Sequence, residues 1–101
     1  AAGSSPAYFY LFLEAMQTEA ERQGFDHATA RLMVQQAMLG AAEMVCHNSH
    51  LELSELRTQV TSKAGTTAKA IESFQQQGLE QVVSIAMQAA VKRAEEMAKQ
   101  F

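Results

Sequence analysis

Apolar residues recur along this chain at the three- and four-residue spacing of one helix face, and no segment shows sustained strand-like alternation. The last segment is the clearest case, because Leu79, Val82, Val83 and Ala86 follow that spacing. We therefore predict an all-α fold. Five helices are expected, over residues 6–23, 27–47, 53–60, 67–77 and 79–101.

Capping residues and glycines define most of the expected helix ends. Ser5 before Pro6 resembles an N-cap followed by a proline at the first helical position, where the missing amide costs nothing. Asp26 is a second expected N-cap. Gly24 and Gly78 are expected to end the first and fourth helices, since glycine tolerates the left-handed conformation there.

The first helix is apolar on nearly every side between Tyr8 and Met16. Such a segment needs cover on several faces. A second copy of the chain would supply it, but a central helix wrapped by its own neighbours would give the same pattern. Both arrangements remain open on the pattern alone.

Composition narrows the class of protein. A chain of 101 residues fits one domain, numbered 1–101. The formal net charge of -3 and scattered cations argue against nucleic acid as a partner. A single cysteine, Cys46, excludes an internal disulfide and fits the cytoplasm. No secretory signal or membrane span is expected, because Glu14 interrupts the short apolar opening.

Residues typical of metal or catalytic sites are few. Cys46, His47 and His50 form one group, but a structural zinc site needs a second pair of ligands. A catalytic pair of cysteine and histidine is also weakly supported, because Cys46 stands at a helix end with no evident orienting partner. We predict neither a metal site nor a catalytic residue in this chain.

The most informative stretch is VTSKAGTT, residues 60–67. With Thr66 as the N-cap of the fourth helix, the amides of the next three residues would point outwards, where the helix dipole favours an anion. Ser62 and Thr67 would add hydroxyl groups, and Lys63 a positive charge. The alternative is that these residues only cap a helix after a turn.

Three stretches together resemble the C-terminal dimerisation domain of pyrroline-5-carboxylate reductases: GSSPAYFYLFLEAM, MLGAAEMV and LRTQVTSKAGTTAKAIESFQQQGLEQVV. The resemblance covers essentially the whole chain. It implies a five-helix domain that forms an intertwined dimer, and many such enzymes stack their dimers into larger rings. Within the loop, Lys63 stands at the family's proline position and Ala64 at its first glycine position.

The resemblance also implies a function. Such enzymes reduce 1-pyrroline-5-carboxylate to L-proline with NADPH or NADH, which an N-terminal Rossmann domain binds. No such pattern occurs in these residues, so we expect the chain to be part of a longer enzyme and to be inactive alone. Carried over by position, the substrate-binding residues are Ser62, Gly65, Thr66 and Thr67.

Three points stay open at this stage. One is the choice between NADPH and NADH. Another is whether the substrate is a different cyclic imine acid. The last is an alternative from another class, a non-catalytic helical dimerisation or interaction module that binds no small molecule.

Overall fold

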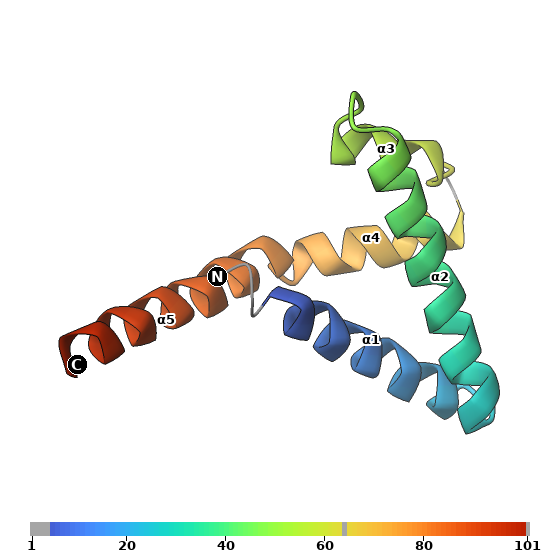
Figure 1. The fold of residues 1–101 in the computed structure, drawn as a ribbon. Helices are drawn as coiled ribbons and strands as arrows, with labels where there is room; N and C mark the ends of the chain where they lie inside the picture. Colours follow the sequence, from blue (N-terminus) through green and yellow to red (C-terminus); the bar gives the residue numbers. More distant parts are fainter. Residues whose placement is uncertain (1–4, 64, 101) are drawn as a thin grey trace. The chain divides into compact units, whose positions relative to one another are not determined.

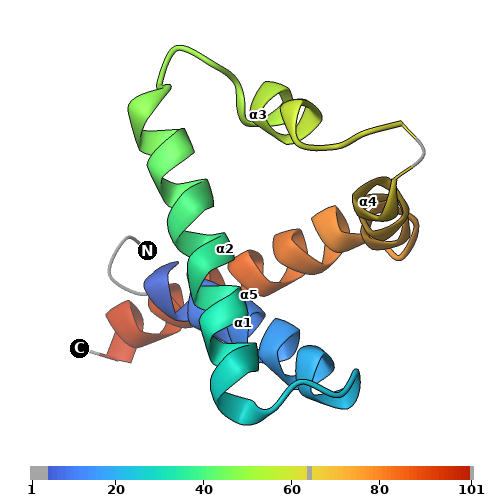
Figure 2. The same cartoon turned by 90° about the vertical axis from the view of Figure 1, so that its right-hand side faces the viewer.

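A computed structural model describes residues 5–63 and 65–100. The described residues form helices joined by turns and loops, without a strand, in agreement with the predicted all-α fold (Figures 1 and 2). The helices are α1 (Ser5–Arg22), α2 (His27–His47), α3 (Leu53–Gln59), α4 (Thr66–Gln76) and α5 (Leu79–Gln100). The chain divides into two compact units between Leu56 and Arg57, within α3.

In the unit that contains α1 and α2, a tight turn reverses the chain between the two helices (Figure 1). Gly24 has a φ of 111°, a left-handed conformation that glycine adopts without a steric penalty. Asp26 is the N-cap of α2, and its carboxylate accepts a hydrogen bond of 2.7 Å from the Thr29 amide. The predicted stop and the predicted cap are both confirmed.

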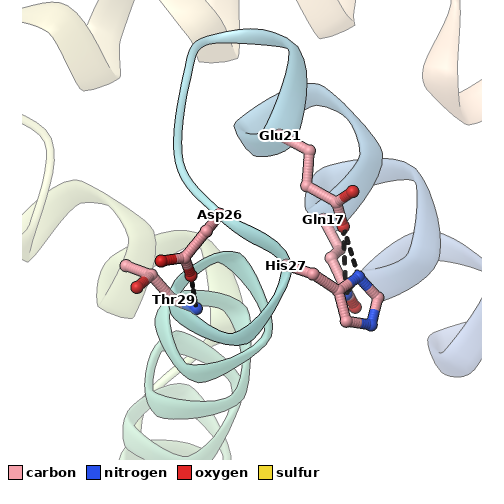
Figure 3. Close-up of polar contacts among 5 residues, drawn as sticks. All are labelled: Gln17, Glu21, Asp26, His27 and Thr29. Atoms are coloured by element: carbon pink, nitrogen blue, oxygen red, sulfur yellow. Dashed lines mark hydrogen bonds and ion pairs between the residues drawn. The ribbon is translucent and has the colours of Figure 1, made fainter.

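Polar side chains join α1 to the start of α2 (Figure 3). His27 Nδ1 lies 2.9 Å from Glu21 Oε2, and Gln17 Nε2 donates to the same carboxylate oxygen at 3.2 Å. All three side chains are at the surface, where a pair of this kind contributes little to stability. The His27 side chain is 82% exposed, so this histidine is a surface residue.

The hydrophobic core of this unit is very small. Ala30 is 0% exposed and Val34 is 6% exposed, and no other described residue is buried. Both follow the three- and four-residue spacing of one apolar stripe of α2, but Met33, Met44 and Val45 of the same stripe are exposed. The two helices diverge from their turn, so α1 covers α2 only near the turn (Figure 1).

The second unit contains α4 and α5. Gly78, with a φ of 82°, separates them, as predicted from the sequence. The chain changes direction there: Figure 2 shows α4 end-on and α5 running across the view. An open apolar hollow of about 430 Å³ lies beside this bend, lined by Ala70, Ser73, Phe74, Gln77, Leu79 and Val82.

Several predicted helix boundaries differ from the structure by one residue, among them the start of α1 and the end of α3. The helix α1 begins at Ser5, so Ser5 is its first residue rather than its cap, and Pro6 is the second. Proline is tolerated there too, because an amide in the first turn has no acceptor within the helix. Val60 lies just beyond α3, and Phe101, the expected last residue of the fifth helix, lies outside the described residues.

Across the described residues, no helix combines the length and apolar character needed to cross a membrane.

Candidate functional site

The candidate site is the segment 60–67, which consists of the connection between α3 and α4 and the first two residues of α4, and which we call the α3–α4 loop. It belongs with α4 to one compact unit, so its residues are placed relative to that helix. Ser62, Thr66 and Thr67 are exposed, and Gly65 is half-buried. Lys63 is also exposed, whereas Ala64, the other expected departure from the family pattern, lies outside the described residues.

The N-cap of α4 is Gly65, not Thr66 as predicted. Gly65 has φ −82° and ψ 171°, and its carbonyl accepts the first helical hydrogen bond, from the Lys69 amide at 3.3 Å. No side chain caps this helix start. Thr66 is therefore the first helical residue and Thr67 the second.

Ser62 closely approaches the cap residue Gly65. The Ser62 hydroxyl oxygen lies against Gly65 so closely that a Cβ atom at this position would overlap it. The Gly65 amide also donates to the Ser62 carbonyl at 3.3 Å. A side chain at position 65 would force the Ser62 hydroxyl to move away, so glycine is what allows this hydroxyl to lie next to the start of α4.

The shift changes which amides are available to a ligand. The outward-pointing amides of the first turn belong to Thr66, Thr67 and Ala68, because none of them has a carbonyl four residues earlier within the helix. The Lys69 amide was expected to belong to this group. It donates instead to the Gly65 carbonyl, in the first hydrogen bond of the helix. The helix dipole adds a partial positive charge at the same place, so the geometry suits an anion.

The predicted site residues thus lie together at one helix end. Ser62 contacts Gly65, and Thr66 and Thr67 follow directly along the chain. None of the four lines the apolar hollow beside α4 and α5. The polar loop, rather than the hollow, carries hydrogen-bond donors that suit a charged ligand.

Sequence reasoning missed one residue of this loop, Thr61. Its hydroxyl donates to the Arg57 carbonyl at 2.6 Å and so closes the end of α3. A threonine just after the last turn of a short helix was the available signal.

The residues weighed as metal ligands do not form a site. Cys46 is an exposed free cysteine, and the part of the chain that the structure describes holds no group of three His, Cys, Asp or Glu side chains arranged for a metal ion.

Comparison with known proteins identifies the family. The family model described as pyrroline-5-carboxylate reductase dimerisation matches residues 1–97. The chain belongs to this family. The resemblance noted in the sequence is thereby confirmed, and the all-α five-helix fold agrees with solved members of the pyrroline-5-carboxylate reductases.

Individual relatives agree with the family match. The chain is 63% identical over 101 residues to a pyrroline-5-carboxylate reductase of Vibrio alginolyticus, covering 100% of this chain and 37% of that protein. It is 54% identical to the enzyme of Pasteurella multocida, covering 98% of this chain and 36% of that protein. The chain therefore spans little more than a third of the length of these relatives.

Two solved pyrroline-5-carboxylate reductases share the fold. That of Coxiella burnetii is 41% identical with a TM-score of 0.86, over 92% of this chain and 34% of that one. That of Plasmodium falciparum, solved with NADP bound, is 28% identical with a TM-score of 0.87, over 94% of this chain and 36% of that one.

Proposed function

We propose that this chain is the dimerisation and substrate-carboxylate-binding part of an enzyme that reduces 1-pyrroline-5-carboxylate to L-proline with NADPH or NADH. The observation that carries the proposal is the family match over residues 1–97. The named relatives, which are pyrroline-5-carboxylate reductases, support it. The same match does not favour the alternative of an interaction module without a small-molecule ligand.

The nicotinamide cofactor would be bound mainly by another part of the enzyme. Dinucleotide sites of the Rossmann type need a strand, a glycine-rich turn and a helix, and the described residues contain helices without any strand. They therefore do not fit a dinucleotide site. We propose that an N-terminal Rossmann domain, within the length that the relatives have beyond this region, fills that role.

The role of this chain would be to hold the substrate carboxylate at the start of α4. The amides of Thr66 and Thr67 and the Ser62 hydroxyl would donate hydrogen bonds to it, and Lys63 would add a positive charge nearby. Gly65 would keep this surface free of a side chain. Holding the carboxylate aims the imine carbon at the nicotinamide, which supplies the hydride when bound.

The dimer would cover the apolar residues of α1. Phe9 and Leu11 are each 68% exposed, and no residue of this helix is buried. The description of the matching family as a dimerisation domain supports a second copy as the cover, rather than the chain's own helices. Assembly of dimers into larger rings is left open, and the exposed thiol of Cys46 fits a cytoplasmic location.

The proposal is tested by assaying the full-length protein that contains this chain. We expect oxidation of NADPH or NADH that depends on 1-pyrroline-5-carboxylate and yields proline in equal amount. The 101-residue chain alone should give no turnover, because it lacks a dinucleotide site among its described residues. A full-length protein that leaves the imine unchanged, or turnover by the chain alone, would contradict the proposal.

A further inference from the structure

The end of α3, just before the proposed carboxylate site, is closed by hydrogen bonds from Val60 and Thr61. The Thr61 amide turns back to the Thr58 carbonyl at 3.2 Å, which is the tighter three-residue pattern. The Arg57 carbonyl, which this amide would reach in a continuing α-helix, accepts the Thr61 hydroxyl at 2.6 Å instead. The Val60 amide donates to the same carbonyl at 3.2 Å.

Both hydrogen-bond donors of Thr61, its amide and its hydroxyl, are therefore bound to the last turn of α3. Since α3 is short, its end would otherwise fray, and the following residues would leave it in several directions. The hydroxyl adds a second attachment point next to the backbone hydrogen bond. Together the two bonds define the direction in which the chain enters the loop.

The residue whose place depends on that direction is Ser62. It follows Thr61 directly, and its hydroxyl lies against Gly65 at the start of α4. Its carbonyl accepts the Gly65 amide at 3.3 Å. Ser62 thus lies directly between the closed end of α3 and the start of α4, with its hydroxyl beside Gly65.

We propose that Thr61 is a positioning residue for the substrate carboxylate, acting through Ser62 without touching the substrate. This inference rests on the proposed function, because it assumes that Ser62 and the start of α4 bind the carboxylate. The Thr61 hydroxyl donates a hydrogen bond to the Arg57 carbonyl, so this donor orients the loop and does not bind the ligand. A valine at this position keeps the shape of threonine and removes only that bond.

The test uses the full-length enzyme with Thr61→Val and Thr61→Ser. We expect Thr61→Val to raise KM for 1-pyrroline-5-carboxylate about 2- to 10-fold, the value of one neutral hydrogen bond. The turnover number should hardly change, because a carboxylate contact stabilises the ground state and the transition state alike. Thr61→Ser keeps the hydroxyl and should restore KM, and KM for the nicotinamide cofactor should not move in either variant.

The matched control is Ser84→Ala. It removes a hydroxyl of the same unit that accepts a hydrogen bond of 2.9 Å from Gln88, on α5 and outside the loop. We expect wild-type KM values from it. Thr61→Ala also removes the hydroxyl, so it replaces Thr61→Val in this test if the valine variant does not fold.

The inference is overturned if folded variants without the hydroxyl keep the wild-type KM for the imine, or if Thr61→Ser loses as much as Thr61→Val. It is also overturned if both KM values change together with the melting temperature, which would indicate a purely structural role. A wild-type enzyme that does not reduce the imine would instead refute the proposed function.

Discussion

Gly65 and Ser62 show how one missing Cβ atom shapes the candidate site. The absence of a side chain at Gly65 lets the Ser62 hydroxyl approach the start of α4. The same absence leaves α4 without a side-chain cap, so no capping side chain accepts a hydrogen bond from its first amides. In a substrate site these two effects support each other, because free amides and a nearby hydroxyl both donate to a carboxylate.

Thr66→Pro tests the amide at the first position of α4. Gly65 already has the extended backbone that a following proline requires, and proline is compatible with the first helical position. The helix should therefore form normally. Substrate affinity should fall roughly 10- to 150-fold, the value of one charge-assisted hydrogen bond of about 1.5 to 3 kcal/mol.

Thr66→Ala is the matched control, because it removes the hydroxyl and keeps the amide. It should lose less affinity for pyrroline-5-carboxylate or proline, measured by KM or by titration. Cofactor binding should be unchanged in both variants. If the proline variant is folded and dimeric with wild-type affinity, this helix start is only a cap and the assigned site is wrong.

At the scale of elements, the turn between α1 and α2 is the best specified part of the chain. Gly24 supplies the left-handed residue and Asp26 supplies the cap, and each acts within a few residues of its own position. The hydrogen bond from the Thr29 amide holds the pKa of the Asp26 carboxyl below its ordinary value of 3.8. The cap is thus linked to stability through protonation.

We expect Asp26→Ala to lower the melting temperature and Asp26→Asn to lower it less, because asparagine keeps an acceptor for the Thr29 amide. The stabilisation from the charged carboxylate is fully present above pH 3.8 and is lost as the pH falls through the lower folded pKa. Melting temperatures measured from neutral pH down to about 2 should therefore show the wild type and Asp26→Asn converging in acid. A gap between them that stays constant would contradict the linkage.

At the scale of the whole molecule, the described residues include many more exposed than buried large apolar side chains. The described core consists of Ala30 and Val34, while α1 keeps Phe9, Tyr10 and Leu11 at its surface. Exposed apolar surface of this kind marks an interaction site in soluble proteins. A second copy of the chain would move these residues from water into an interface.

Leu11→Glu tests that interface. A carboxylate buried at a dimer interface without a partner costs about 3 to 5 kcal/mol, so the dissociation constant of the dimer should rise at least about 100-fold. Sedimentation equilibrium at low micromolar concentration measures the change. Thr18→Glu, which adds the same charge to the exposed end of α1 beyond the apolar segment, should leave the dimer intact. A wild-type chain that is a folded monomer would defeat the dimer proposal.

The sequence by itself determined the five helices, most of their ends and the position of the candidate loop. These features depend on short-range chemistry: Gly24 and Gly78 at left-handed positions, Asp26 as a cap, and the helical spacing of apolar residues. The resemblance to the family pointed to four residues of the loop, Ser62, Gly65, Thr66 and Thr67. They lie close together in space because they are close in the sequence.

Only the tertiary structure decided the cap of α4 and the extent of the core. Thr66 is the better capping residue by type, but the helical hydrogen bonds begin at the Gly65 carbonyl, so Gly65 is the N-cap and Thr66 the first helical residue. Likewise, Met33 and Val34 belong to one apolar stripe, yet Val34 is buried and Met33 is exposed. A pattern marks which face of a helix avoids water; what covers that face depends on where the other helices, or a second chain, come to lie.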